Sequence, residues 1–253
     1  MTSSQDGRGT RLGLPDSISV ALFDLDGVLT DTATVHRRAW REVFDDYLRE
    51  HCGSGFQPFS EDDYLRYVDG RPRADGVREF LRSRGITLPE GDPDAEPGDS
   101  TVQAIGNRKN ARLLSFIERE GVQVYPGSVD YLAAVRAAGL RVGVVTASAN
   151  AVAVLKTTGL ADSVDVRVDG TVVAELGLRG KPAPDGFLEA ASRFEVPPRQ
   201  AAVFEDAVAG VAAGHAGGFG FVVGVDRVGG SHRHELIDAG ADVVVGDLSE
   251  LKE

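Results

Sequence analysis

The sequence of 253 residues contains a single cysteine, Cys52, and fewer basic than acidic residues. One cysteine excludes an internal disulfide bond and is typical of a protein from a reducing compartment. Lys and Arg together number 27 against 39 Asp and Glu, which gives a net charge of −12. Because no basic surplus is present to neutralise a phosphate backbone, we expect no nucleic-acid partner. No apolar run is long enough to span a bilayer, so we expect no membrane segment.

The beginning of the chain, MTSSQDGRGTRLGLPD, also lacks the apolar core of a signal peptide. We interpret residues 1–16 as a disordered tail and expect a cytoplasmic protein. Hydrophobic residues make up 42% of the chain and charged residues 26%, which is ordinary for a globular protein. The length suffices for one large domain or two modest ones, each with a true core.

Short apolar segments alternate with helical ones over much of the chain. Buried strands that alternate with helices predict βαβ units and a parallel sheet. We therefore predict an α/β fold with a Rossmann-like core. The predicted strands span 19–25, 140–148, 201–206 and 219–225, with an edge strand at 241–248, and the predicted helices between them span 128–139, 185–196 and 207–218.

After the first predicted strand this alternation stops, and no strand candidate occurs before about residue 121. Amphipathic helices are predicted there instead, over 35–50, 60–68, 73–85 and 104–120. A stretch rich in Pro, Gly and acidic residues, 89–100, reads as a loop. We predict an all-helical cap domain at residues 37–121, inserted into a core domain formed by residues 17–36 and 122–253.

Functional side chains stand at the carboxyl ends of the predicted strands, where open parallel sheets bind their ligands. Asp24 and Asp26 end the first strand; as residues i and i+2 they point the same way and repel each other. A divalent cation would relieve this repulsion, and oxygen ligands suit Mg²⁺ best. The other residues expected at this edge are Thr146, Ala147, Ser148, Lys181, Glu205 and Asp206.

Each of these features taken alone has an ordinary explanation. An Asp-x-Asp pair or a Glu-Asp pair after a strand often caps a helix, and a lysine before a proline is usually a solvated charge. Their joint occurrence at strand ends favours a catalytic site. An aspartate can act as a nucleophile and form an aspartyl-phosphate when a metal ion and a cation neutralise the phosphoryl oxygens. Lys181 can supply that cation, and Thr146 with neighbouring backbone N–H groups can hold another oxygen.

Four motifs resemble those of haloacid dehalogenase superfamily phosphotransferases: DLDGVLTDT (24–32), VVTAS (144–148), GKPAP (180–184) and VFEDAVAG (203–210). The resemblance extends over nearly the whole chain beyond the tail. It implies that Asp24 is the nucleophile and a Mg²⁺ ligand. It also implies that Asp26 is the general acid and base and a further ligand through its backbone carbonyl. The implied phosphate-binding residues are Thr146, Ala147, Ser148 and Lys181, and Glu205 and Asp206 complete the implied metal site.

More narrowly, the chain resembles β-phosphoglucomutases in FDLDGVLTDTATVHRRAW (23–40), GRPRADGV (70–77) and VYPGSVDYL (124–132). This resemblance implies that His36 helps to direct the phosphoryl group to a sugar and not to water. It further implies that Arg73 grips the phosphate that is not transferred, for which a bidentate guanidinium is well suited. As alternatives, His36 is an ordinary polar residue at a helix start and Arg73 a solvated surface charge.

The chain departs from that pattern in the cap. Asp69 stands where the resembling proteins usually carry a lysine, which leaves the sugar specificity open, and Arg71 is a possible substitute. The missing lysine also weakens an alternative interpretation as a phosphonoacetaldehyde hydrolase, because that enzyme needs a cap lysine to form a Schiff base. Lys109 can face the cleft, but a position without a role in the site is the favoured interpretation. Asp26 and Thr146 are 120 positions apart, whereas Thr146 and Lys181 are only 35 apart. The cap is therefore inserted between the first and the second of the four motifs.

Three functional hypotheses stay open. The leading one is a Mg²⁺-dependent β-phosphoglucomutase that interconverts β-glucose 1-phosphate and glucose 6-phosphate through a 1,6-bisphosphate. The second is a sugar-phosphate phosphatase of the same fold, in which water attacks the aspartyl-phosphate. A non-catalytic binding module is disfavoured because every catalytic position is filled. The expected partner is a small phosphorylated sugar, and the expected state is a monomer.

Overall fold

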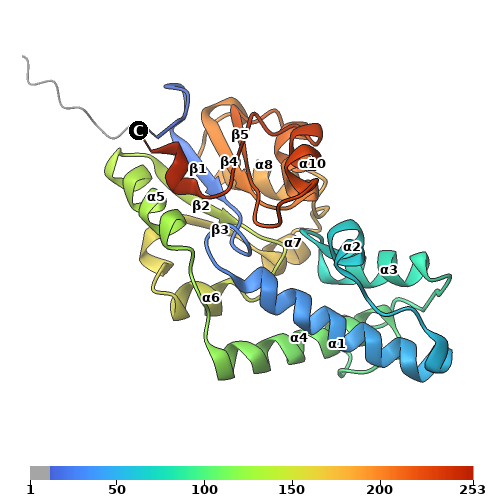
Figure 1. The fold of residues 1–253 in the computed structure, drawn as a ribbon. Helices are drawn as coiled ribbons and strands as arrows, with labels where there is room; N and C mark the ends of the chain where they lie inside the picture. Colours follow the sequence, from blue (N-terminus) through green and yellow to red (C-terminus); the bar gives the residue numbers. More distant parts are fainter. Residues whose placement is uncertain (1–11, 253) are drawn as a thin grey trace, which may run out of the picture.

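The computed structural model describes residues 12–252, and its elements fall into two groups (Figure 1). One group is a six-stranded sheet with helices on both faces, and the other consists of helices inserted after the first strand. The strands are β1 (Val20–Phe23), β2 (Arg141–Val145), β3 (Val166–Val168), β4 (Ala201–Glu205), β5 (Phe221–Val225) and β6 (Val243–Val245).

The sheet is parallel throughout, with the strand order β3-β2-β1-β4-β5-β6. β1 lies at its centre, where Val20 pairs with Arg141 of β2 on one side and Ala201 of β4 on the other. β1 and β4 are buried along their whole lengths, because helices cover both faces of the sheet. The predicted α/β fold with inserted helices is thereby confirmed.

Two apolar layers enclose the sheet. On one face, α5 (Pro126–Ala137) and α6 (Ala151–Thr157) cover a cluster in which the rings of Phe23 and Phe204 stack with centroids 4.4 Å apart. On the other face, α8 (Asp185–Arg193), α9 (Val208–Ala216) and α10 (His232–Asp238) pack against a second cluster. Both layers leave the carboxyl ends of the strands uncovered, and these ends face the inserted helices (Figure 1).

The inserted helices have an aromatic core of their own. Trp40, Phe44, Phe59 and Phe80 lie within it, and the rings of Phe44 and Phe80 approach to 4.1 Å between centroids. The helical nature of this inserted segment agrees with the sequence analysis. The inserted elements are α1 (Thr32–Cys52), α2 (Glu61–Asp63), a π-helical turn (Tyr64–Val68), α3 (Arg73–Ser83) and α4 (Val102–Glu120).

Some elements were not predicted. β3, α6 and α7 (Gly170–Glu175) escaped notice because each is at most seven residues long. β3 also carries Arg167 in its centre, so it lacks the continuous apolar pattern of its neighbours. Short 3-10 helices connect elements at Gly53–Gly55, Ala161–Ser163 and Pro198–Gln200, and another follows β6 at Leu248–Leu251.

Two parts of the predicted division of the chain can be compared with the structure: the N-terminal tail and the first domain boundary. Leu12 and Leu14 pack against the core, and the Tyr131 hydroxyl donates to the Leu12 carbonyl at 2.7 Å, so residues 12–16 have defined contacts. The rest of the predicted tail lies outside the described residues. The predicted boundary between residues 36 and 37 falls within α1, and the division into two domains stays a prediction.

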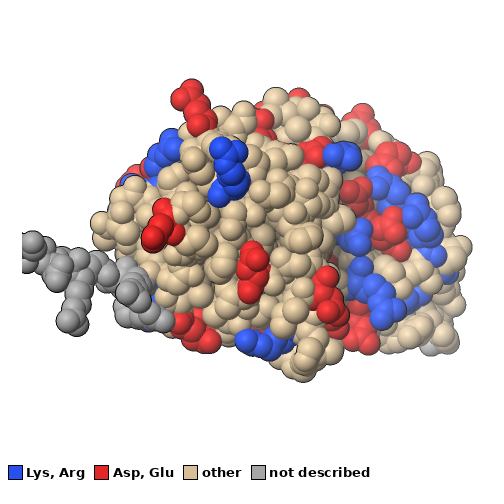
Figure 2. Space-filling view, turned by 90° about the horizontal axis from the view of Figure 1, so that it is seen from above, with Lys and Arg blue, Asp and Glu red and all other residues tan. Residues whose placement is uncertain are grey.

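The surface charges are distributed unevenly. Figure 2 shows basic and acidic side chains crowded over the end of the molecule where α2 and α3 lie, and more widely spaced charges elsewhere on this face. Ion pairs join charged residues in α2, in α3 and directly after α3, including Arg84 with Asp63 and Arg78 with Asp75. None of the helices formed by residues 12–252 combines the length and hydropathy that a bilayer crossing requires.

Candidate active site

A buried lysine connects two carboxylates at the centre of the sheet edge. Asp24 directly follows β1, and its backbone N–H donates to the Phe204 carbonyl, which extends the strand pairing by one residue. The Lys181 ammonium donates to the carboxylates of Asp24 and Glu205, each at 2.5 Å, and to the Val145 carbonyl at 3.0 Å. The carboxyl ends of β1, β2 and β4 are thus joined at one cation.

Burial governs the charges in this group. It raises the pKa of the Asp24 carboxyl well above its usual value, although the ammonium of Lys181 counteracts the effect. Burial alone would lower the pKa of Lys181, yet the carboxylates of Asp24 and Glu205 raise it above its usual range. Lys181 is therefore a permanent positive charge beside Asp24, where the negative oxygens of a phosphoryl group can be neutralised.

The side chain of Asp26 is held by hydroxyl groups from both sides of the site. Thr146 donates from its hydroxyl to one carboxylate oxygen at 3.1 Å, and the hydroxyl of Thr32 donates to the other. The Nε2 atom of His36 lies 3.8 Å from the oxygen that Thr32 contacts. Asp26 thus lies between a core residue at the end of β2 and the first turn of α1, at the start of the inserted helices.

Asp206 lies close to Gly27, the residue that directly follows Asp26. Gly27 has φ +94°, and a Cβ atom there would lie 1.9 Å from an oxygen of Asp206, so only glycine permits this approach. Burial raises the pKa of Asp206 well above its usual value, and the charges of Asp69 and Glu205 raise it further. The carboxylates of Asp24, Glu205 and Asp206 are hard oxygen donors of the kind that Mg²⁺ prefers. Among the described residues, however, they do not form a group whose oxygens all lie within 4.8 Å of one another.

The segment after β2 presents its backbone to the same space. The Thr146 N–H continues the sheet by donating to Val168, and the Thr146 hydroxyl accepts from the N–H of Ser148 at 3.1 Å. Gly170 lies so close that a Cβ there would be 2.6 Å from the carbonyl of Ala147. These contacts fix Thr146, Ala147 and Ser148 in a tight turn beside the carboxylates.

From the inserted helices, Arg73 and Lys109 bring positive charge to the opposite side. Arg73 begins α3 and donates to the side-chain carbonyl of Asn107 at 2.8 Å, and burial lowers the pKa of its guanidinium. Lys109 is only 3% exposed, and its ammonium lies 3.0 Å from Nδ1 of His36 and 5.0 Å from the Trp40 ring centroid. Burial lowers the pKa of Lys109 to about 7.

His36 is a neutral link between Lys109 and Asp26. Burial and the nearby charge of Lys109 lower the pKa of His36 to about 4, although Asp26 opposes this shift. At neutral pH the imidazole is therefore uncharged, and its Nδ1 can accept a hydrogen bond from the Lys109 ammonium. The other nitrogen then carries a proton and faces the carboxylate of Asp26.

The position of Lys109 corrects the sequence analysis, which favoured an ordinary position for it. A usable signal was present: Ile105, Lys109 and Leu113 follow one another at four-residue spacing on α4, and all three are buried. Lys109 therefore lies on the same helix face as apolar core residues. A lysine on such a face lies either in a polar cleft or beside a buried partner.

Asp69 and Arg71 lie on the loop that precedes α3, which touches the core. A Cβ atom on Gly180 would lie 2.0 Å from Pro72, and one on Gly70 would lie 2.9 Å from Ala207. Burial raises the pKa of Asp69 to about 6. The residue at the expected lysine position is thus a desolvated carboxyl group that faces the carboxylates of the core.

One cavity of about 610 Å³ lies between the sheet edge and the inserted helices. Asp69, Arg71, Lys109, Asn110 and Asn150 also line it, and Asn150 donates to Asn110 at 2.8 Å across its wall. The structure brings all of the predicted site residues to this cavity. These are Asp24, Asp26, His36, Arg73, Thr146, Ala147, Ser148, Lys181, Glu205 and Asp206.

The family model described as haloacid dehalogenase-like hydrolase matches residues 18–218. The protein belongs to this family. A protein of Mycobacterium tuberculosis (strain CDC 1551 / Oshkosh) named beta-phosphoglucomutase is 53% identical over 249 residues, which cover 96% of this chain and 95% of that protein. A validoxylamine A 7'-phosphate phosphatase of Streptomyces hygroscopicus subsp. limoneus is 31% identical, over 92% of this chain and 95% of that one.

The same architecture occurs in solved structures. A crystal structure of beta-phosphoglucomutase from Clostridium difficile superposes with a TM-score of 0.74 at 26% sequence identity, and the match covers 93% of each chain. The parallel sheet and the inserted helices thus recur together in a relative of known structure.

Proposed function

We propose that the protein is a Mg²⁺-dependent β-phosphoglucomutase that converts β-glucose 1-phosphate to glucose 6-phosphate through an aspartyl-phosphate and a 1,6-bisphosphate. The observation that carries the proposal is the pairing of two unlike walls around one cavity. The core wall holds Asp24, Asp26 and Lys181, and the wall formed by the inserted helices holds Arg73 and Lys109. A sugar with phosphates at both ends matches a cavity with cations at both walls. The 53% identity to a protein named beta-phosphoglucomutase supports the same conclusion.

In the proposed reaction, Asp24 carries the phosphoryl group. The 6-hydroxyl of β-glucose 1-phosphate attacks the phosphorus, so that a bond from phosphorus to O6 forms while the bond to Asp24 breaks. Asp26 takes the hydroxyl proton. The 1,6-bisphosphate then turns end for end, and Asp24 attacks the phosphorus at C1. The bond from phosphorus to O1 breaks, Asp26 returns the proton to O1, and glucose 6-phosphate leaves.

The remaining core residues stabilise the group in transfer. Lys181 neutralises phosphoryl oxygens beside Asp24, and the hydroxyl of Thr146 with the N–H groups of Ala147 and Ser148 can hold another oxygen. The carboxylates of Asp24, Glu205 and Asp206 and the backbone carbonyl of Asp26 would hold the Mg²⁺ ion. When bound, the ion withdraws charge from the phosphoryl oxygens. We further expect a monomer in the cytoplasm, and both points stay predictions.

The proposal also specifies that a sugar hydroxyl, and not water, attacks the aspartyl-phosphate. In the described arrangement, hydroxyl groups of Thr32 and Thr146 occupy both oxygens of Asp26, which keeps this base from activating a stray water. A sugar phosphate that binds Arg73 can shift the inserted helices and free Asp26 for its task. The alternative function is a sugar-phosphate phosphatase, and the 31% identity to a validoxylamine A 7'-phosphate phosphatase favours keeping it.

One assay tests both functions. The purified protein is mixed with Mg²⁺, β-glucose 1-phosphate and a trace of glucose 1,6-bisphosphate, and glucose 6-phosphate and free phosphate are measured in parallel. A mutase forms glucose 6-phosphate in large excess over phosphate, and a chelator stops both signals. Phosphate release without glucose 6-phosphate would replace the mutase by the phosphatase. Activity that survives complete removal of divalent cations would overturn the metal requirement.

A further inference from the structure

The two connections between the sheet and the inserted helices lie side by side. The N–H of Asp31 in the outgoing connection donates to the Gln123 carbonyl at 2.9 Å. The N–H of Tyr125 in the returning connection donates to the Leu29 carbonyl at 3.0 Å, and Thr30 pairs with Val124 in an antiparallel bridge. The connections thus form a short two-stranded ribbon, and any movement of the inserted helices starts from it.

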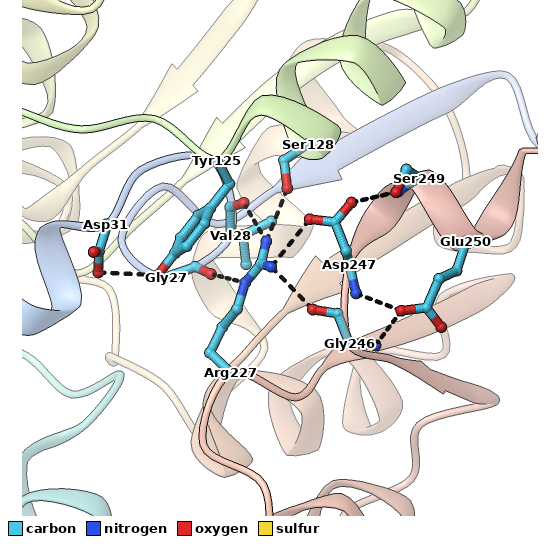
Figure 3. Close-up of polar contacts among 10 residues, drawn as sticks. All are labelled: Gly27, Val28, Asp31, Tyr125, Ser128, Arg227, Gly246, Asp247, Ser249 and Glu250. Atoms are coloured by element: carbon cyan, nitrogen blue, oxygen red, sulfur yellow. Dashed lines mark hydrogen bonds and ion pairs between the residues drawn. The ribbon is translucent and has the colours of Figure 1, made fainter.

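Arg227, between β5 and α10, fastens this ribbon to the core (Figure 3). Its side chain is 15% exposed, and its guanidinium carbon lies 3.7 Å from the ring centroid of Tyr125. An arginine suits this place because a planar fork can stack on a ring while its N–H groups reach acceptors on several sides. The acceptors are the carbonyls of Gly27 (3.1 Å), Val28 (3.4 Å) and Gly246 (2.9 Å), Ser128 Oγ (3.0 Å) and Asp247 Oδ2 (3.2 Å).

Both ends of this arrangement are anchored. On the C-terminal side, the Glu250 carboxylate accepts from the N–H groups of Gly246 and Asp247 at 3.0 and 2.9 Å (Figure 3). On the side of the inserted helices, the Tyr125 hydroxyl donates to the carboxylate of Asp31 at 3.0 Å, immediately before α1 begins. Arg227 and Tyr125, which we call the hinge clamp, therefore join the fixed core to the start of α1.

The hinge clamp also reaches the loop that carries the acid and base. Gly27 follows Asp26 directly, and its N–H donates to the Thr30 carbonyl at 2.7 Å. Arg227 holds the carbonyl of the same residue, so both sides of the Gly27 peptide are fixed. The carboxylate of Asp26 can then lie between the hydroxyl groups of Thr32 and Thr146. Arg227 touches no reacting atom and acts through this loop.

We propose that the hinge clamp is a positioning device that determines how much of the phosphoryl group reaches the sugar and how much is lost to water; this rests on the proposed mutase function. Transfer to a sugar hydroxyl requires Asp26, the 6-hydroxyl and the aspartyl-phosphate in one alignment, and an error of about 1 Å can cost on the order of 10²-fold in rate. Water arrives without such alignment. A loosened clamp therefore slows the mutase step more than hydrolysis.

The test compares Arg227→Met, Arg227→Lys and Tyr125→Phe with Arg136→Met. Tyr125→Phe is the mildest change, because it keeps the ring under Arg227 and removes only the bond to Asp31. Arg136 is the matched control: it lies on α5 and donates to the Ser163 carbonyl and the Asp165 carboxylate, away from the ribbon. Glucose 6-phosphate and phosphate are measured together, and amide hydrogen exchange is followed over residues 27–32 and 121–126 without substrate.

We expect Arg227→Met to lower kcat of the mutase by about 10- to 100-fold with little change in KM, and to raise phosphate formed per glucose 6-phosphate at least about fivefold. Arg227→Lys and Tyr125→Phe should lie between it and the wild type. Amide hydrogen exchange over residues 27–32 and 121–126 should rise with the loss of mutase activity, so that it is fastest in Arg227→Met. Arg136→Met should match the wild type in both measurements. Wild-type partition and linker exchange in both Arg227→Met and Tyr125→Phe would overturn the inference.

The exchange measurement separates this inference from the proposed function. If the wild type makes no glucose 6-phosphate, the mutase proposal fails, and with it the role in partition. The hinge clamp itself is then decided by exchange alone: faster exchange of the linkers in Tyr125→Phe, but not in Arg136→Met, supports it. Unchanged exchange refutes it. If Arg227→Met does not fold, Tyr125→Phe and Arg227→Lys give the same comparison.

Discussion

The two walls of the cavity balance their charges in different ways. In the core, Lys181 lies between the carboxylates of Asp24 and Glu205, so its positive charge is already paired with carboxylates. In the inserted helices, Arg73 donates to an amide oxygen and Lys109 contacts an imidazole nitrogen. The core wall therefore has its counter-charges built in. The opposite wall has cations with neutral partners, which an anionic substrate can satisfy.

The directions of the pKa shifts express the same difference. The neighbouring carboxylates outweigh burial and leave Lys181 with a raised pKa, whereas burial leaves Lys109 and Arg73 with lowered ones. A desolvated cation without a counter-ion destabilises the fold that contains it. We infer that the cation of the core wall has its counter-charges before substrate arrives, and that the cations of the opposite wall gain theirs only when a phosphate is bound. This difference can be tested from either side.

Removing the nucleophile should have the largest effect. Asp24→Asn should lower both glucose 6-phosphate formation and phosphate release by at least about 10³-fold, because neither sugar nor water has an aspartyl-phosphate to attack. Substrate binding, measured by calorimetry, should persist because Arg73 and Lys109 are unchanged. Asp165→Asn, at an exposed position directly before β3, serves as the control. Turnover that survives in Asp24→Asn would remove Asp24 as the nucleophile.

Changing Arg73 should separate binding from chemistry. We expect Arg73→Ala to raise KM for β-glucose 1-phosphate by about 10- to 100-fold, because a charge-assisted pair with phosphate is lost. Hydrolysis of acetyl phosphate, which has no second phosphate to grip, should change little. Arg73→Lys should give an intermediate KM, because it keeps the charge but not the fork. Equal losses with both substrates would mean that Arg73 supports the fold and not the distal phosphate.

The sequence allowed the core wall to be predicted almost completely. Parallel strands bring their carboxyl ends to one edge whatever their order, so the strand pattern alone was enough to place Asp24, Thr146 and Glu205 together. Lys181 was placed there by its motif, and it lies between two of the predicted carboxylates. The roles assigned to these residues stay predictions, because proximity alone does not decide which group attacks.

The opposite wall was harder to predict because its residues come from helix faces. Which face of α4 lines the cleft depends on how α1 and α4 pack, and sequence spacing shows only that Ile105, Lys109 and Leu113 share a face. Arg73 was found through the motif that contains it. The hinge clamp was missed for a related reason: Arg227 lies about 200 positions from the loop that it holds, and its neighbours show no periodic pattern.

Replacing Lys109 should have the smallest effect, and it should be a gain in stability where the other substitutions cause a loss of activity or affinity. Its pKa is about 7 in the folded protein and about 10.5 in the unfolded chain. Below pH 7 both states are charged, so the folded state bears the full cost of the buried cation; between pH 7 and 10.5 that cost disappears as the folded protein releases its proton. Lys109→Met should therefore raise Tm at pH 6, by roughly 3–6 °C, and less at pH 9.

Two further effects must be considered when the Tm values of Lys109→Met at pH 6 and pH 9 are compared. Without the charge of Lys109, the lowered pKa of His36 should rise, which stabilises the variant further on the acidic side. Loss of the uncharged part of the side chain changes Tm equally at both pH values, so the difference between them reports the charge of Lys109, including its contact with the Trp40 ring. Lys156→Met, at an exposed position of α6, should show no such change. A Tm difference that is the same at pH 6 and pH 9 would mean that Lys109 is already paired with an anion, as Lys181 is. A difference that grows toward acid, together with weaker substrate binding, would show that this wall trades stability for a phosphate site.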